Sequence, residues 1–87
     1  MKIRDGFIVK NIANTNVVVA VGDATKYLSG TITLNDSGLL IWKELEKGCE
    51  KVRLIELMLE NYDTDAKTAE RDIDAFISTL KKHEIII

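Results

Sequence analysis

The feature that most constrains the fold of this chain is a single change in the spacing of its apolar residues, near Leu34. Before this point apolar side chains recur with period two, and after it they recur every three or four residues. The first spacing is typical of strands and the second of helices, so the sequence predicts an α+β domain. With 87 residues, no proline and no linker, we expect one domain over residues 1–87.

Three strands are expected in the part before Leu34. Residues 7–13 alternate, with Phe7 and Val9 on one face. Residues 14–16 form a polar connection of hairpin length, and residues 16–22 are the most apolar strand. Residues 30–34 alternate threonine with aliphatic side chains. This pattern predicts a three-stranded antiparallel meander, with the valine-rich strand in the centre and the first and third strands at the edges.

The valine-rich strand carries apolar side chains on both faces. Val18 and Ala20 share one face, and Val17, Val19 and Val21 share the other. The hydrophobic core explains only one of the two faces. We expect the other to dock on a second subunit, giving a homodimer, or on a partner enzyme.

The first helix is expected to begin after Asn35, which is a good N-cap residue, and to end at Gly48. Its buried face has the spacing i, i+3, i+4, i+7 and consists of Gly38, Ile41, Trp42 and Leu45. Trp42 offers an alternative role, because an indole can stack on a ligand. On this apolar stripe we interpret it as core.

The second helix is expected over residues 50–61. The side chains predicted to face inward are Val52, Ile55, Leu59 and Tyr62. Three more apolar residues widen its arc beyond what one contact surface needs, namely Leu54, Leu57 and Met58.

A third helix is expected over residues 65–82, capped by Thr64. Its core stripe consists of Ala69, Ile73, Phe76, Ile77 and Leu80. Flanking that stripe lie Asp65, Thr68, Asp72, Ala75 and Thr79. Three of these flanking side chains are small, so they either leave a trough for a peptide strand or form an ordinary solvated face.

Composition excludes several functions. The net charge is −2, and residues 63–74 hold five acids, which disfavours nucleic acid as a partner. The longest apolar run, residues 17–21, is too short to cross a membrane, and no signal peptide is visible. One cysteine, Cys49, and one histidine, His83, allow neither a disulfide nor a zinc site, so we expect a cytoplasmic protein with no metal.

The sequence also contains no nucleophile–base pair, phosphate loop or cysteine cluster, and we therefore expect no catalytic residues and no cofactor. Two reactive side chains have plain interpretations beside more specialised ones. Cys49 is either an ordinary thiol or a reactive one near a helix N-terminus. His83 is either a cation at a helix C-terminus or a pH-sensitive group.

Residues 32–42, ITLNDSGLLIW, resemble the hallmark of the PqqD-like family, a strand ending in Leu-Asn followed by a helix with Ile-Trp. Gly48, Tyr62-Asp63 and the pattern of the last helix also fit, so the resemblance covers essentially the whole chain. Two positions depart from the family pattern: Cys49 stands where Ser or Thr is common, and Lys67 where Glu is common.

The resemblance implies a winged-helix-like domain, also called a RiPP recognition element. Such a domain binds the leader of a ribosomally made precursor peptide and delivers it to a modifying enzyme, often a radical SAM protein. The leader is held as an added strand on the third strand, beside the third helix. The residues expected to bind it are Gly30, Thr31, Ile32, Thr33, Leu34, Thr68, Asp72, Ala75 and Thr79.

Two alternatives stay open. A winged-helix DNA-binding regulator would place its third helix in the major groove, but that helix opens with acids that repel phosphate. A subunit whose apolar strand face serves only in assembly is the third possibility.

Overall fold

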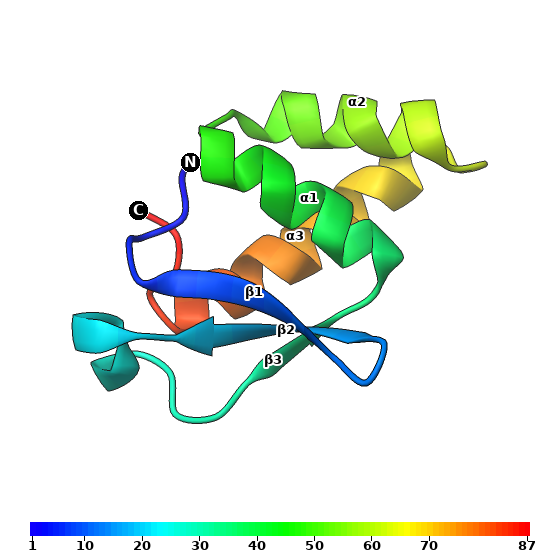
Figure 1. Ribbon diagram of the computed structural model, residues 1–87. Coiled ribbons are helices and arrows are strands. Elements are labelled where there is room, and N and C mark those ends of the chain that lie inside the picture. Colours follow the sequence, from blue (N-terminus) through cyan, green and yellow to red (C-terminus); the bar gives the residue numbers. More distant parts are fainter.

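The computed structural model describes residues 1–87 as a three-stranded antiparallel sheet followed by three helices (Figure 1). The strands are β1 (Phe7–Ile12), β2 (Thr15–Ala20) and β3 (Ile32–Leu34), in the spatial order β1-β2-β3. The helices are α1 (Asp36–Lys47), α2 (Lys51–Asn61) and α3 (Ala66–Lys82), and a 3-10 helix, η1 (Gly22–Lys26), connects β2 to β3. The α+β class and the meander with β2 in the centre are confirmed.

The hairpin turn lies one residue earlier than the sequence predicts. Ala13 and Asn14 connect β1 to β2 and have φ values of 51° and 66°. Two consecutive left-handed residues make a two-residue turn of the I′ kind, whose twist matches that of the flanking strands. Thr15 and Asn16, expected in the connection, therefore pair with β1 as part of β2.

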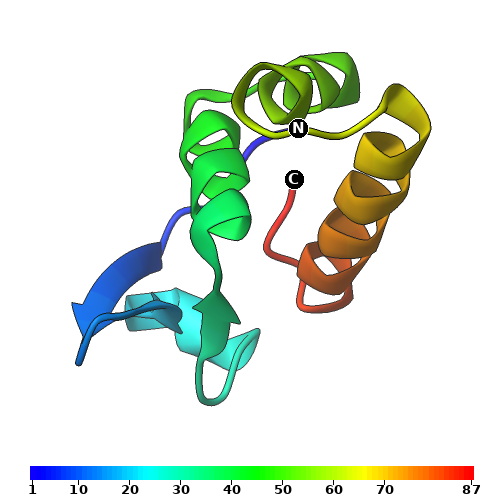
Figure 2. The same cartoon turned by 90° about the vertical axis from the view of Figure 1, so that its right-hand side faces the viewer.

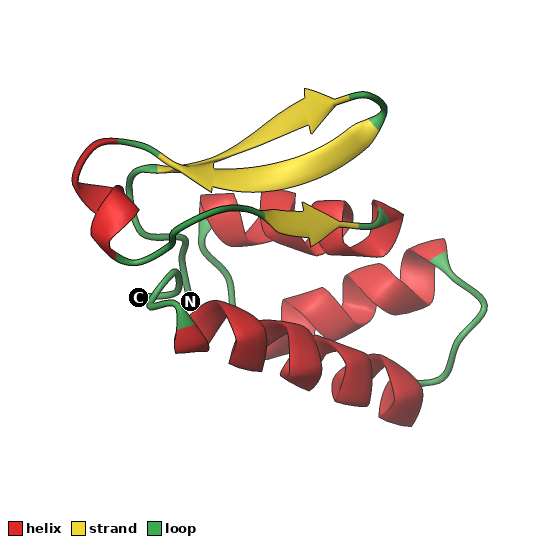
Figure 3. Ribbon diagram, turned by 90° about the horizontal axis from the view of Figure 1, so that it is seen from below, coloured by secondary structure: helices red, strands yellow, loops and turns green.

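The three long helices all lie on one side of the sheet (Figure 3). The strand residues that face them alternate with those that face away, and the inward set is Phe7, Val9, Val18, Ala20, Ile32 and Leu34. Trp42 is fully buried in the core, as the sequence predicts. Its indole N–H has no hydrogen-bond partner, so Trp42 stabilises the fold through its volume.

Helix α1 begins and ends where the sequence predicts. The side chain of Asn35 accepts a hydrogen bond from the Gly38 backbone N–H at 2.8 Å, which satisfies one of the free donors at the helix start. Gly48 follows the last turn with φ 85°, a conformation that favours glycine.

The prediction for the inward face of α2 is wrong. Its buried residues are Leu54, Leu57 and Met58, the three that were expected only to widen the apolar arc. Most of the predicted inward set is exposed: Val52 by 62%, Leu59 by 42% and Tyr62 by 39%, with Ile55 half-buried. Both sets of residues have helical spacing, so the apolar periodicity alone did not show which face of α2 is turned toward the core.

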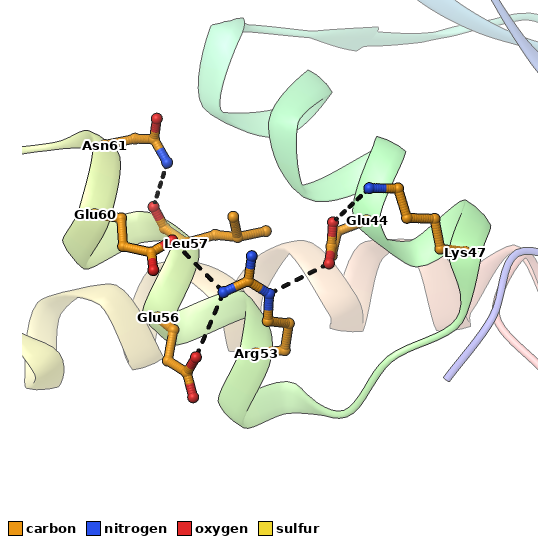
Figure 4. A network of polar contacts seen from close by, with 7 residues as sticks. All are labelled: Glu44, Lys47, Arg53, Glu56, Leu57, Glu60 and Asn61. Atoms are coloured by element: carbon orange, nitrogen blue, oxygen red, sulfur yellow. Dashed lines mark hydrogen bonds and ion pairs between the residues drawn. The ribbon is translucent and has the colours of Figure 1, made fainter.

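Ion pairs lie on both flanks of the buried face of α2. Arg53 Nε lies 3.3 Å from Glu44 Oε1 of α1, and its Nη1 lies near Glu56 and Glu60 (Figure 4). On the other flank, Lys51 Nζ lies 3.0 Å from Asp74 Oδ1 of α3. Successive residues of an α-helix are rotated by 100° about its axis. Leu54 therefore lies between the flank of Arg53 and the flank of Lys51, and Val52 points away from the protein.

The start of α3 differs from the sequence prediction by one residue. Asp65, and not Thr64, is the N-cap, since its side chain accepts a hydrogen bond from the Thr68 N–H at 2.7 Å. This backbone hydrogen bond holds the pKa of the Asp65 carboxyl below its ordinary value. The negative charge of an aspartate in this position also interacts favourably with the positive end of the helix dipole, and a threonine has no such charge.

The two ends of the chain pair with each other, which the sequence did not predict. Ile3 and Ile86 form an antiparallel bridge, and Arg4 N–H donates to the Ile85 carbonyl at 2.7 Å. Ile85 is fully buried in the core, and both termini lie side by side in Figure 1. None of the helices combines the length and the apolar character needed to cross a membrane.

The C-terminal segment is expected to stabilise the whole domain. Ile85→Ala removes a fully buried side chain and should lower the free energy of unfolding by about 2–5 kcal/mol, because it leaves a cavity. Ile87→Ala is the matched control: Ile87 is 63% exposed, and its loss should change stability by less than about 0.5 kcal/mol. Urea titration followed by circular dichroism measures both. Equal, small effects would show that the C-terminal segment is not part of the core.

Candidate functional site: a groove beside an open sheet edge

A groove of about 340 Å³ lies between the start of α1 and the exposed flank of α3. Its apolar floor comes from all three long helices and consists of Ile41, Met58, Ile73, Ala75 and Phe76. Its polar rim consists of Asn35, Ser37, Asp72 and Thr79, with Gly38 completing the lining. The groove therefore suits an apolar side chain whose backbone or polar neighbours meet the rim.

Three of the four α3 residues singled out in the sequence line this groove: Asp72, Ala75 and Thr79. The fourth, Thr68, does not. It is half-buried in the first turn of α3 and borders a separate, wholly polar hollow near Arg71.

Asp72 is the only charged residue in the groove. Its carboxylate lies 3.8 Å from Arg71 Nε, and both side chains are more than half exposed, so this ion pair is weak. Thr79 donates its hydroxyl to the Ala75 carbonyl at 3.2 Å, which turns that donor toward its own helix. Asp72 is thus the rim group best able to accept a hydrogen bond or an ion pair from a bound molecule.

Several groove residues were expected from the sequence only as helix caps or core residues. Asn35 caps α1 and also borders the groove, and Met58 comes from the α2 face whose orientation was predicted wrongly. The signal that could have located this wall is Gly38, a glycine inside a helix. A Cβ there would lie 3.1 Å from the Asn35 side chain and 3.6 Å from that of Leu34, so the absence of a side chain keeps this end of the groove open.

Strand β3 is shorter than expected. It spans Ile32–Leu34, so Gly30 and Thr31 lie in the preceding connection, where Gly30 has φ 96°. Leu34 is buried in the core, Ile32 packs against it, and Thr33 points to the opposite, exposed side. Figure 2 shows β3 at the side of the sheet nearest α3, with β1 at the far side.

The hydrogen-bond phase of the sheet identifies which β3 backbone groups are free. Val21 N–H donates to the Gly6 carbonyl at 2.8 Å, which continues the β1–β2 ladder. Antiparallel residues bond alternately to their two neighbours, so the even-numbered β2 residues Asn16 and Val18 face β3. They pair with Leu34 and Ile32.

Thr33 lies between these two bonded positions and opposite Val17, which bonds to β1. The N–H and C=O of Thr33 therefore point away from the sheet. They form an open edge on the side where the groove lies.

The other sheet edge, on β1, is protected. Lys10 and Asn11 lie on it, and a lysine on an edge strand discourages pairing with another chain. β3 contains no charged residue. Of the two edges, only β3 therefore combines an unprotected backbone with a groove.

The two other reactive side chains lie outside the groove. Cys49 is half-buried, and its backbone exchanges hydrogen bonds with Met1. Burial, and then the negative charge of Glu44, raise the pKa of its thiol. His83 is the C-cap of α3. No three His, Cys, Asp or Glu side chains are grouped so that they could hold a metal ion.

Comparison with known proteins gives one family and two solved structures. The family model described as Coenzyme PQQ synthesis protein D (PqqD) matches residues 16–86. A structure of TbiB1 in complex with the TbiA(beta) leader peptide has a TM-score of 0.77 and 26% identity, covering 98% of this chain and 93% of that one.

A structure of lasso peptide synthetase B1 complexed with the leader peptide has a TM-score of 0.73 and 25% identity. The match covers 93% of this chain and 89% of that one. No curated protein matches.

The raised pKa of Cys49 predicts slow alkylation. A higher pKa leaves less thiolate at a given pH, so iodoacetamide should react at pH 8 more slowly with the folded protein than with the urea-unfolded chain. The midpoint of the rate-against-pH curve should lie above that of the unfolded chain. A folded-state midpoint at or below the unfolded one would instead indicate an activated thiol.

Proposed function

The chain belongs to the PqqD family, and we propose that it binds the leader segment of a ribosomally made precursor peptide and presents it to a separate modifying enzyme. The observation that carries this proposal is the open backbone edge of β3 at Thr33, beside the groove. Two solved structures of similar fold, TbiB1 and lasso peptide synthetase B1, are complexes with leader peptides. The radical SAM type of enzyme implied by the family resemblance stays a prediction.

In this proposal the leader adds a fourth strand to the sheet next to β3. It exchanges backbone hydrogen bonds with the N–H and C=O of Thr33, and strand addition of this kind supplies affinity with little dependence on sequence. Ile32 and Leu34 hold the edge in place from the other side, because their backbone groups bond to β2. Gly30 and Thr31 directly precede β3 in the chain, and they contact the part of the leader that extends past the residues paired with β3.

Side chains provide the specificity. Alternate residues of an added strand point to opposite faces of the sheet, so every second leader side chain faces the helices and α3. An apolar one fits the groove floor, against Ile73 and Phe76. The next inward residue, two positions along the leader, meets Asp72 if it is basic or donates a hydrogen bond, and the small side chain of Ala75 leaves room for the strand. Thr68, outside the groove, contacts only a leader that continues toward the start of α3.

The chain is proposed to act as an adaptor that performs no chemistry itself. The polar groups of the groove are an amide, hydroxyls and one carboxylate. Ser37 donates its hydroxyl to the Asn35 side chain and not to Asp72, the one carboxylate of the groove. This arrangement binds and orients a peptide.

A pair of proline substitutions tests strand addition. Proline removes the backbone N–H, so Thr33→Pro should leave the domain folded but weaken leader binding, because that N–H faces outward. Ile32→Pro breaks a bond to β2 and should destabilise the domain by about 3 kcal/mol. Circular dichroism reports folding, and titration with a fluorescently labelled leader reports binding. Undiminished binding by a folded Thr33→Pro variant would rule out backbone pairing at this edge.

A second substitution tests the position of the groove. Ala75→Trp fills it with a bulky side chain and should weaken leader binding at least about tenfold with an almost unchanged melting temperature, since Ala75 is exposed. Lys81→Trp is the matched control, at an exposed position of the same helix that does not line the groove. Equal affinities for the two variants would place the leader elsewhere.

A further inference from the structure

The sheet has a second face that the proposed leader site does not use. The three long helices cover only one side of it, as Figure 3 shows. On the other side β1 and β2 direct a set of aliphatic side chains away from the helices, here called the outer face: Ile8, Ile12, Val17, Val19 and Val21. Within this set Val17 is buried and Val19 half-buried, and the exposed members are Ile8, Ile12 and Val21. The exposed fraction is 55% for Ile12, 44% for Val21 and 39% for Ile8. Exposed aliphatic side chains that share one face of a sheet usually mark a contact with another molecule.

The outer face is continuous with the leader site. Val17 pairs with Thr33 of β3, whose side chain points to the same outer side. A leader strand beside β3 would direct every second side chain to this side as well, next to Thr33. A protein docked on the outer face would therefore contact the sheet and the outward side chains of the leader together.

The charge of the outer face indicates what kind of molecule covers it. Lys10 is its only charged side chain and makes no ion pair within the chain. The three strands contain no Asp or Glu. A second copy seated face to face would thus cover each Lys10 with a surface that has no acid, and an unpaired charge is costly to bury. A different protein with a carboxylate opposite Lys10 avoids this cost.

We propose that the outer face docks the modifying enzyme, through an apolar patch on that enzyme that carries a carboxylate opposite Lys10. The inference rests on the proposed function, because it takes the enzyme as the molecule that receives the leader. It adds that the enzyme recognises the sheet directly and that a bound leader enlarges the docking surface. The enzyme should accordingly bind the leader-loaded protein more tightly than the free one.

A second exposed apolar set, on α2, serves as the comparison surface. Val52 and Leu59 lie on the outward side of that helix and Tyr62 directly follows its last residue; the helix is at the opposite end of the molecule from the sheet in Figure 1. This set does not adjoin β3, so a leader strand would not extend it. A substitution of Val52 on α2 also replaces an exposed aliphatic side chain, as a substitution on the outer face does, but it lies in a different part of the molecule.

The test compares the double variant Ile8→Ser/Ile12→Ser, the charge reversal Lys10→Glu and the control Val52→Ser. Each is titrated with the labelled leader of a precursor peptide alone, and then with the purified enzyme that modifies that precursor, with and without leader. The serine pair and Lys10→Glu should each weaken enzyme binding about tenfold or more, with leader affinity unchanged within about twofold. Val52→Ser should change neither. All the positions are exposed, and circular dichroism confirms folding.

Several results would overturn the inference. The first is that the outer-face variants bind the enzyme as tightly as the wild-type protein. The second is that Val52→Ser weakens enzyme binding. The third is that the wild-type protein is a dimer which Ile8→Ser/Ile12→Ser converts to a monomer. Absence of enzyme binding by the wild-type protein would also overturn it. Failure of the proposed function itself looks different, because the wild-type protein would then not bind the leader in the first titration.

Discussion

The structure depends on the pairing of β3 with β2. Only three residue pairs join these strands, yet they order the strand that the proposed function uses. Ile32 and Leu34 direct their backbone groups to β2 and their side chains to the core, so both are held from two directions. Thr33 between them is left with its N–H and C=O facing outward. Because the edge is already ordered before a peptide binds, less conformational entropy is lost on binding.

The groove depends on how the helices are set against that strand. Leu34 is followed at once by Asn35, which caps α1, so the end of β3 and the start of α1 form one continuous wall. The floor includes Met58, which lies on the buried face of α2, between the ion pairs of Arg53 and Lys51. Exposed ion pairs contribute little to stability. The orientation of α2 therefore rests on the packing of its buried side chains, Leu54, Leu57 and Met58, against α1 and α3.

Much of the fold could be predicted from the sequence, because its signals were local. The change of period near Leu34 predicted the strands and helices, and Asn35 and Gly48 predicted the bounds of α1. The failures arose where two local patterns competed or where a contact joined distant segments. Which of the two overlapping apolar stripes on α2 is buried depends on packing against α1 and α3, and the burial of Ile85 depends on pairing between the chain termini.

The candidate site shows the same division. Asp72, Ala75 and Thr79 were found by helical spacing, whereas Met58 depended on the tertiary arrangement.

The central claim is that the backbone of Thr33 is free in the domain and bonded when a leader is present. Amide hydrogen exchange measured by NMR, with and without a bound leader peptide, tests this. We expect the Ile32 and Leu34 amides to exchange slowly in both states, and the Thr33 amide to exchange fast in the free protein and slowly in the complex. A Thr33 amide that still exchanges fast at saturating leader would contradict strand addition to β3.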